Sequence, residues 1–483
     1  METKILTGSE CDLEAAAELI RDGKTVAFPT ETVYGLGANA LDGDAVRGIF
    51  AAKGRPSDNP LIVHIADTAE VERLAREIPQ DARTLMERFW PGPITIILKK
   101  QPCIPDEVTA GLDTVGIRMP ESELARRFIA KCGVPIAAPS ANISGKPSPT
   151  TFEHTKQDMD GRAAGIIKGE DCRVGVESTV IDMSGEIPTV LRPGGISAEE
   201  LREVLGEVRI GAELVKDGIP KAPGMKYKHY SPKAQVYILH GSADSAARFV
   251  EKRSKMRRTA VIAFDEFRNL MPKSAEFFSL GSAKDPESAA HRLFDCLRRC
   301  DKDNIKEAYA PEIPDNGLWR AVKNRLYKAA AGRLLNTETA KSVLFVCTGN
   351  TCRSPMAEAL FNISGKNAVA MSAGLAASGA SPASPNAIAA GPGYGAGFKK
   401  HFGFGSGIRR RFKKSYIGAD NGGNDRKRRF NTDYDKGAQD VPSAVGQDKN
   451  ALRVCGSGRR CKRPVRRRYR SLQKMRRTNK GID

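Results

Sequence analysis

Residues 25–37 read T-V-A-F-P-T-E-T-V-Y-G-L-G, a short apolar run that ends at a proline and a polar segment. The run over residues 25–30 predicts a buried strand, and the segment over residues 31–37 predicts a turn. A capped helix around residues 13–21 precedes this strand, and a second helix is expected over residues 44–53. Because strands and helices alternate from the start, the sequence predicts an α/β sheet.

Polar and charged groups gather where the predicted elements end. Further strands are expected in the apolar runs at 61–65, 94–98, 114–120 and the start of 134–145. Such ends are a usual place for groups that converge on a ligand, and cations with hydroxyls suit a polyphosphate. Taken singly, the cations can be solvated loop residues, the threonines turn formers, and His64 a core histidine. The groups at these ends are Lys53, Arg55, Arg118, Arg192, Ser140, Asn142, Ser148, Ser178 and Thr179.

Six ordered motifs between residues 5 and 205 carry a resemblance. They read F-P-T-E-T-V-Y-G-L-G, K-G-R-P-S-D-N-P-L-I-V-H, G-I-R-M-P, A-P-S-A-N-I-S-G-K-P-S-P-T, V-E-S-T-V-I-D and L-R-P-G-G-I. In this order they resemble the threonylcarbamoyl-AMP synthase family of the YrdC-like type. The resemblance implies a twisted mixed sheet and the synthesis of threonylcarbamoyl-AMP and pyrophosphate from ATP, L-threonine and bicarbonate, for the t6A base of tRNA.

The resemblance also implies roles for matching residues. Threonine and its carboxylate would be held by Thr32, His64, Arg118 and Ser178. ATP would be held by Lys53, Arg55, Asn59, Ser140, Asn142, Ser148 and Arg192, with Lys53 and Arg55 also stabilising charge during the reaction. Mg²⁺ is expected on the ATP phosphates, and no metal cage of protein ligands is expected. The reaction needs aligned reactants and neutralised phosphate charge more than a protein nucleophile, and no Ser-His-Asp set stands out in this part.

The chain beyond residue 205 extends the resemblance. Residues 206–233 end in K-A-P-G-M-K-Y-K-H-Y-S-P-K, which has the composition of a linker. Its H-Y-S-P element resembles the linker of the longer family members that folds over the nucleotide, so Tyr230 is a candidate ATP contact. Strands at 236–239 and 259–264 and helices at 243–255, 288–300 and 318–331 then predict a small second α/β domain, with a doubly wound shape and no catalytic constellation.

A second kind of chemistry begins near residue 341. The apolar run S-V-L-F-V leads to Cys347, five residues later stands Arg353, and Pro355 opens a predicted helix. A C-x5-R loop between a strand and a helix is a phosphate cradle in which the same field makes the cysteine a thiolate nucleophile. The segment V-C-T-G-N-T-C-R-S-P-M-A-E resembles the low-molecular-weight tyrosine phosphatases, with Thr351 closest to the arginine phosphatase branch, and S-A-G-L at 372–375 also matches. The alternative is a buried structural cysteine beside a helix-capping arginine.

The last part of the chain has a different composition. Of the 77 Lys and Arg and 57 Asp and Glu in 483 residues, residues 391–483 hold 26 basic residues, seven Asp and no Glu. Residues 1–390 therefore carry 51 basic and 50 acidic residues, so the net charge of +20 says nothing about nucleic-acid binding by the main body. With two Leu and many Gly and Arg, the tail cannot bury a core and is predicted to be disordered.

Two explanations of the tail stay open. It is either a basic, RNA-binding segment or the product of a frame slip in the coding sequence. Permitted codons for G-P-G-Y-G-A-G-F-K-K at 391–400, read one base later, give A-R-D-T-G-R-D-L-K, and G-S-G-R-R at 456–460 permits D-P-D-G-G. The second string contains the Asp-Pro general acid that the phosphatase family needs and that residues 391–483 lack as written, so we favour the frame slip.

These observations fix the predicted organisation. The synthase domain is expected at 1–205, the lid linker at 206–233, the second synthase domain at 234–335, a partial phosphatase domain at 341–390 with an inactive loop, and the out-of-frame tail at 391–483. A cytoplasmic synthase that passes its adenylate to a separate t6A transferase, with tRNA only an indirect partner, is the leading function. A phosphatase as the active unit and a non-catalytic RNA-binding protein are the alternatives. No membrane contact is expected, because no apolar stretch is long enough to span a bilayer and the N-terminus lacks the apolar core of a secretory signal.

Overall fold

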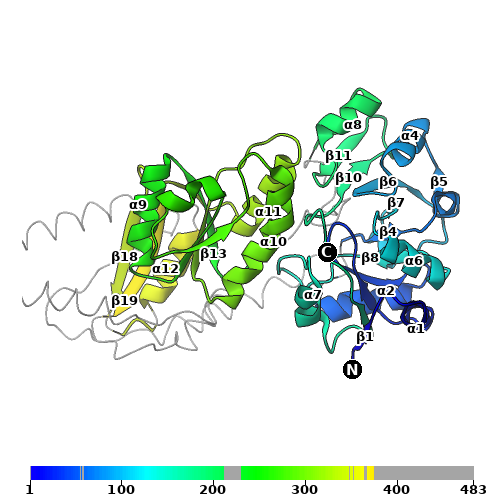
Figure 1. The fold of residues 1–483 in the computed structure, drawn as a ribbon, viewed down its shortest axis with the longest axis horizontal. Helices are drawn as coiled ribbons and strands as arrows, with labels where there is room; N and C mark the ends of the chain where they lie inside the picture. Colours follow the sequence, from blue (N-terminus) through cyan, green and yellow to red (C-terminus); the bar gives the residue numbers. More distant parts are fainter. Residues whose placement is uncertain are drawn as a thin grey trace, which may run out of the picture. The chain divides into compact units, whose positions relative to one another are not determined.

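The computed structural model describes residues 2–54, 56, 59–211, 230–347, 349–351, 353–363 and 367–374, and the side chain of Arg353 is not among the described ones (Figure 1). Several predictions therefore fall outside the described residues. They concern Arg55, most of the linker, residues 375–390 of the expected phosphatase domain, and the tail at 391–483. The chain divides into a unit of residues 1–408 and a unit of residues 409–483, and all described residues belong to the first.

Residues 2–211 form the first module, built on one mixed sheet. Within the described residues its strand order is β1-β9-β2-β3-β8-β4-β7-β6-β10-β11-β12, and β5 pairs with β6. The strands are β1 (Lys4–Leu6), β2 (Val26–Phe28), β3 (Gly35–Asn39), β4 (Ile62–His64), β5 (Ala75–Glu77), β6 (Ile94–Lys100), β7 (Thr114–Arg118), β8 (Ile136–Ala138), β9 (Gly165–Ile167), β10 (Thr179–Asp182), β11 (Thr189–Arg192) and β12 (Arg209–Ile210). The helices are α1 (Glu10–Arg21), α2 (Gly43–Lys53), η1 (Thr68–Glu70), α3 (Val71–Leu74), α4 (Gln80–Phe89), α5 (Asp106–Thr109), α6 (Glu123–Cys132), α7 (Phe152–Met159) and α8 (Ala198–Leu205).

Local sequence signals explain where the first helices begin and end. The side chain of Ser9 accepts a hydrogen bond from the amide of Asp12 at the start of α1, and Asp42 caps α2 in the same way. Gly54 takes the left-handed conformation (φ 61°) and ends α2, which leaves Lys53 as its last residue. The predicted turn over residues 31–37 is wrong in its second half, because Gly35–Asn39 form β3, paired antiparallel with β2.

Residues 230–336 form the second module, a parallel sheet in the order β15-β14-β16-β13-β17. Its strands are β13 (Gln235–His240), β14 (Thr259–Ala263), β15 (Glu276–Ser279), β16 (Glu307–Pro311) and β17 (Leu334–Asn336). Its helices are α9 (Ala243–Ser254), η2 (Asp265–Leu270), α10 (Pro286–Lys302) and α11 (Trp319–Ala330), and Figure 1 shows α10 beside α11. The predicted strands and helices are confirmed, and α10 begins earlier than expected because Asp285 caps it before Pro286.

The start of the third segment is also as expected. The parallel pair β18 (Lys341–Cys347) and β19 (Ala368–Gly374) flanks α12 (Arg353–Ile363), so strand, loop and helix follow one another. Val369 of β19 packs with Tyr237 and Phe249 of the second module. The described part of this segment therefore covers apolar side chains of the second module.

The first two modules share apolar contacts as well. Val33 and Val176 belong to the same buried cluster as Tyr230 and Phe294, while the first module also has two large apolar clusters of its own. Across the described ranges, no helix is long and apolar enough to cross a membrane.

Candidate functional site

Three predicted cations end regular elements of the first module. Lys53 is the last residue of α2, Arg118 of β7 and Arg192 of β11, and all three side chains are buried. His64 ends β4 and lies directly opposite Arg118 in the parallel ladder with β7. Ser178 and Thr179 differ from the expectation, because they stand at the start of β10 and not after a strand.

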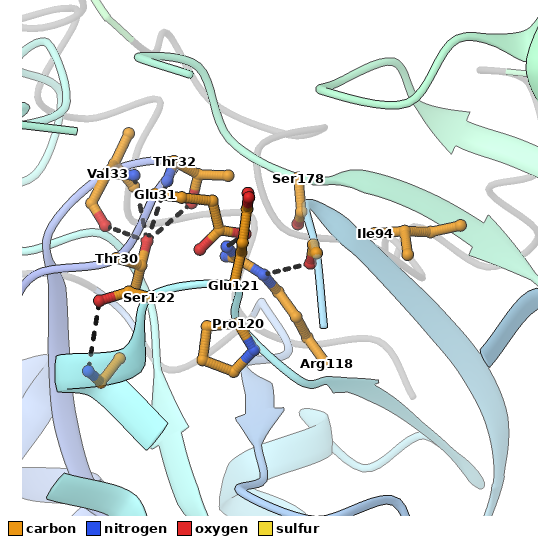
Figure 2. Close-up of polar contacts among 12 residues, drawn as sticks. Thr30, Glu31, Thr32, Val33, Ile94, Arg118, Pro120, Glu121, Ser122 and Ser178 are labelled. Carbon is orange, nitrogen blue, oxygen red and sulfur yellow. Dashed lines mark hydrogen bonds and ion pairs between the residues drawn. The ribbon is translucent and has the colours of Figure 1, made fainter. Parts of the chain in front are cut away.

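Arg118 makes a buried ion pair with Glu31. Its Nη2 donates to Oε1 of Glu31 at 2.6 Å, and both side chains are 4 % exposed (Figure 2). The second oxygen of Glu31 is buried and has no hydrogen-bond partner among the described residues. Figure 2 also shows Ser178 near the Arg118–Glu31 pair. Sequence reasoning missed Glu31, although it lies inside the motif F-P-T-E-T.

His64 is held uncharged beside this pair. Its Nδ1 lies 3.2 Å from the carbonyl oxygen of Ile62, and its ring packs edge-on against Phe28. Burial, and then the positive charge of Arg118, lowers the pKa of His64 to about 3. The imidazole is therefore neutral near pH 7, and because the Ile62 carbonyl oxygen can only accept, Nδ1 carries the proton and Nε2 is left as an acceptor.

Ser178 is held by two neighbours. Arg192 donates from Nε at 3.1 Å and from Nη2 at 2.9 Å to its carbonyl oxygen, and from Nη2 at 3.0 Å to its hydroxyl. The same hydroxyl shares a hydrogen bond of 2.8 Å with Thr95. Burial and the positive charges of Arg325 and Arg118 lower the pKa of Arg192 to about 10. Positive charge is therefore concentrated around Ser178.

Lys53 organises the loop that follows β8. Its ammonium donates to the carbonyl oxygens of Ser140 and of Asn142, the latter at 2.7 Å, and lies 3.4 Å from Oδ1 of Asn142. Ser140 donates to that same Oδ1 at 2.5 Å, and the amide of Asn142 closes the loop onto the carbonyls of Ile143 and Lys146. In this structure Lys53 therefore binds loop oxygens.

Backbone hydrogen bonds tie this loop to the turn after β2. The amide of Ala141 donates to the carbonyl of Tyr34 at 2.7 Å, and the amide of Tyr34 donates to Pro149 at 2.9 Å. In the turn itself, Thr30 shares a 2.9 Å hydrogen bond with Thr32, which is fully buried. Residues 30–34 therefore connect the loop that Lys53 binds with the Arg118 group, which consists of Arg118, Glu31, Thr32, His64 and Ser178.

A second buried acid, Glu177, joins the remaining groups. Ser148 donates to its Oε1 at 2.6 Å, and Arg325 of the second module donates to its Oε2 at 2.8 Å. Burial raises the pKa of Glu177, but Arg325 and Arg192 outweigh that effect and lower it to about 2. Burial and Glu177 raise the pKa of Tyr230, which also packs against Phe294, to about 12. Sequence reasoning missed Glu177 and Arg325, since nothing in a sequence shows which buried charges of two modules pair.

The loop after β18 has the features of a thiolate site. The sulfur of Cys347 lies 2.9 Å from the hydroxyl of Ser354 and accepts a hydrogen bond from the amide of Asn350 at 3.2 Å. Partial burial raises the pKa of the thiol, but hydrogen bonds from Ser354, Asn350 and Gly349 outweigh it, so the pKa lies below its usual value.

No group of three or more His, Cys, Asp or Glu side chains placed to hold a metal ion occurs within the described ranges. Asn59, which was predicted to bind ATP, is fully buried.

Comparisons with known proteins decide the family. A threonylcarbamoyl-AMP synthase of Pyrococcus abyssi is 46 % identical over 333 residues, which cover 68 % of this chain and 96 % of that protein. The threonylcarbamoyl-AMP synthase of Bacillus subtilis is 47 % identical over 340 residues, covering 69 % of this chain and 97 % of its own. The chain belongs to the threonylcarbamoyl-AMP synthase family.

Family profiles match three consecutive parts of the chain. Residues 18–194 match the family described as telomere recombination (Sua5, YciO and YrdC), and residues 196–331 match the threonylcarbamoyl-AMP synthase C-terminal domain. The crystal structure of P. abyssi Sua5 complexed with L-threonine covers 70 % of this chain and 99 % of its own, at 44 % identity and a TM-score of 0.64. Residues 342–402 match the low molecular weight phosphotyrosine protein phosphatase family. Both predicted resemblances are thereby confirmed.

Proposed function

We propose that this synthase converts L-threonine, bicarbonate and ATP into L-threonylcarbamoyl-AMP and pyrophosphate, which serves the t6A modification of tRNA. The observation that carries the assignment is the presence of two buried guanidiniums close to one serine. Arg192 donates to the hydroxyl of Ser178, and Figure 2 shows Arg118 near the same residue. Such a site suits a substrate that has both a carboxylate and phosphates, because two fixed cations offset two centres of negative charge. The P. abyssi relative crystallised with L-threonine supports threonine as the amino acid.

Threonine is the ligand for the Arg118 group. Arg118 binds its carboxylate, while Thr32, neutral His64 and Ser178 supply donors and acceptors for its hydroxyl and amine. Glu31 keeps the Arg118 side chain in place, and its unpaired oxygen is an acceptor for the substrate's ammonium. The threonine amine, once it has lost its proton, combines with bicarbonate to give a carbamate and water.

ATP is the ligand for the second group, made up of Lys53, Arg55, Asn59, Ser140, Asn142, Ser148, Arg192 and Tyr230. A carbamate oxygen attacks the α-phosphorus, a P–O bond to the β-phosphate breaks, and pyrophosphate leaves with the electron pair. This step needs alignment and fixed positive charge, which buried cations such as Lys53 at the end of α2 and Arg192 at the end of β11 provide. The ATP phosphates would bind Mg²⁺, because this hard cation prefers oxygen ligands.

A phosphatase is the second candidate, favoured by the hydrogen bonds that lower the pKa of Cys347. Phosphatase chemistry needs a thiolate nucleophile and also a proton donor for the leaving group. As written, the sequence after residue 390 contains no Asp-Pro. We propose that the synthase is the active unit, located in the cytoplasm and feeding a separate transferase.

The test is pyrophosphate release by the purified chain with ATP, Mg²⁺, threonine and bicarbonate. Release should require both threonine and bicarbonate, and an adenylate with the mass of threonylcarbamoyl-AMP should accumulate. ATP turnover that ignores threonine, or no turnover beside rapid hydrolysis of a phosphoarginine or phosphotyrosine substrate, would reject the assignment.

A further inference from the structure

One side chain of the second module reaches the site of the first. Arg325, on α11, is 0 % exposed, and its Nε donates to Oε2 of Glu177 at 2.8 Å. Its Nη1 donates to the carbonyl oxygen of Pro193 at 2.8 Å. Glu177 directly precedes Ser178, and Pro193 directly follows Arg192. A single guanidinium therefore holds both chain segments that carry these two ligand-binding candidates.

Glu177 connects Arg325 to a third ligand-binding candidate, Ser148. Its other carboxylate oxygen accepts the hydroxyl hydrogen of Ser148 at 2.6 Å, so both oxygens are occupied by partners from different segments. The Arg325 guanidinium also lies 5.7 Å from the ring centre of Tyr230, a described residue near the end of the linker. Arg325 thus lies at the meeting point of four chain segments.

We infer that Arg325 is a positioning residue for the synthase reaction, acting through Glu177 to hold Ser148, Ser178 and Arg192 in the geometry that binds threonine and ATP. The inference rests on the proposed function, and it gives the second module a specific task. Tyr230 is the proposed substrate ligand that this module supplies, and without Arg325 the buried carboxylate of Glu177 loses a principal partner.

The charges around Glu177 provide a readout that packing alone would not give. Arg325 and Lys328 face it from α11, Arg192 from β11, and Tyr230 from the segment before β13. Burial opposes the ionised carboxylate, and Arg325 is the main group that offsets burial. When Arg325 is replaced by a neutral residue, the pKa of Glu177 therefore rises, and activity gains a dependence on pH on the acid side.

The experiment compares full-length variants. Arg325→Met removes the charge, Arg325→Lys keeps it without the fork that reaches both Glu177 and Pro193, and Glu177→Gln removes the carboxylate. The double variant E177Q/R325M removes both partners. Arg320→Met is the matched control, because Arg320 lies on the same helix and also pairs with the first module, through Glu199, but its acidic partners Glu199 and Asp315 are exposed.

The expected result is a fall of about 10²-fold in kcat/KM for ATP in R325M, the scale of a misplaced reacting group. R320M stays within about twofold of the parent, and R325K lies between them. In R325M the acid limb of the pH–rate profile moves toward neutral pH, and in E177Q/R325M that limb disappears while part of the activity returns.

Three kinetic results would overturn the inference. They are parent-like kinetics in a folded R325M, equal losses in R325M and R320M, and an acid limb that does not move. If R325M does not fold, R325K and E177Q decide the question by the same readouts. Two measurements separate the two hypotheses. A parent chain that releases no pyrophosphate rejects the proposed function. Equal ATP affinities across the variants, measured by calorimetric titration, reject the role of Arg325.

Discussion

The substitution Lys53→Met tests whether Lys53 stabilises the loop after β8 in addition to its proposed role in ATP binding. The ammonium, on a side chain that is 2 % exposed, donates to two carbonyl oxygens of the loop after β8 and lies near Oδ1 of Asn142. A hydrogen bond to a charged group contributes about 1.5–3 kcal/mol, and methionine regains part of this by removing a buried charge. We therefore expect Lys53→Met to lower the free energy of unfolding by about 3 kcal/mol.

Two measurements check this expectation. For a module of about 200 residues, that loss corresponds to a melting temperature about 6–12 °C lower, measured by calorimetry. Pyrophosphate release should fall about 10²-fold, because a buried cation that we propose as an ATP ligand is lost as well. Lys24→Met is the control, since Lys24 makes an exposed pair with Asp22 and should change neither quantity. Lost activity at an unchanged melting temperature would refute the structural role, and unchanged values of both would refute the site itself.

Two further predictions concern pH and the phosphatase loop. The pKa of Glu177 is lowered from 4.5 to about 2, so its contribution of about 3 kcal/mol to stability is fully present above pH 4.5 and is lost as the pH falls toward 2. Urea unfolding between pH 6 and pH 2 should show a shallower dependence in Glu177→Gln, and parallel curves would contradict the assignment. Cys347→Ser should leave pyrophosphate release unchanged, while the parent chain shows negligible phosphatase turnover that recovers when one base is added or removed near codon 390. Strong phosphatase activity of the chain as written would show the frame-slip hypothesis to be wrong.

Local signals predicted most of the elements but not their pairing. Ser9, Asp42 and Gly54 mark helix ends that any reader of the sequence can find, and the apolar runs became strands where expected. The error over residues 35–37 has a physical cause. Gly35 and Gly37 resemble turn residues, but a Cβ at Gly37 would approach the side chains of Ile136 and Phe28 to within 3.0 Å, so glycine is needed for close packing inside a strand.

The site was predicted as a set of cations and hydroxyls, and the acids that hold them were missed. Glu31 and Glu177 stand inside quoted motifs, but a carboxylate in a polyphosphate site contradicts simple charge counting. Their role follows only from burial, because a buried guanidinium without a partner is costly and an ion pair fixes its direction. Arg325 lies outside every quoted motif and could be found only once both modules were placed.

The phosphatase segment separates what a short segment can specify from what a domain must supply. A strand, a loop and a helix bring Cys347, Asn350 and Ser354 together, and these contacts, with the amide of Gly349, lower the pKa of the thiol. Nucleophile activation is therefore local. Protonation of the leaving group is not, because the donor must come from a distant part of the chain and be held over the sulfur by a packed core. A reactive thiol at Cys347 would therefore be compatible with the absence of catalytic turnover, and alkylation rates should be read separately from phosphatase rates.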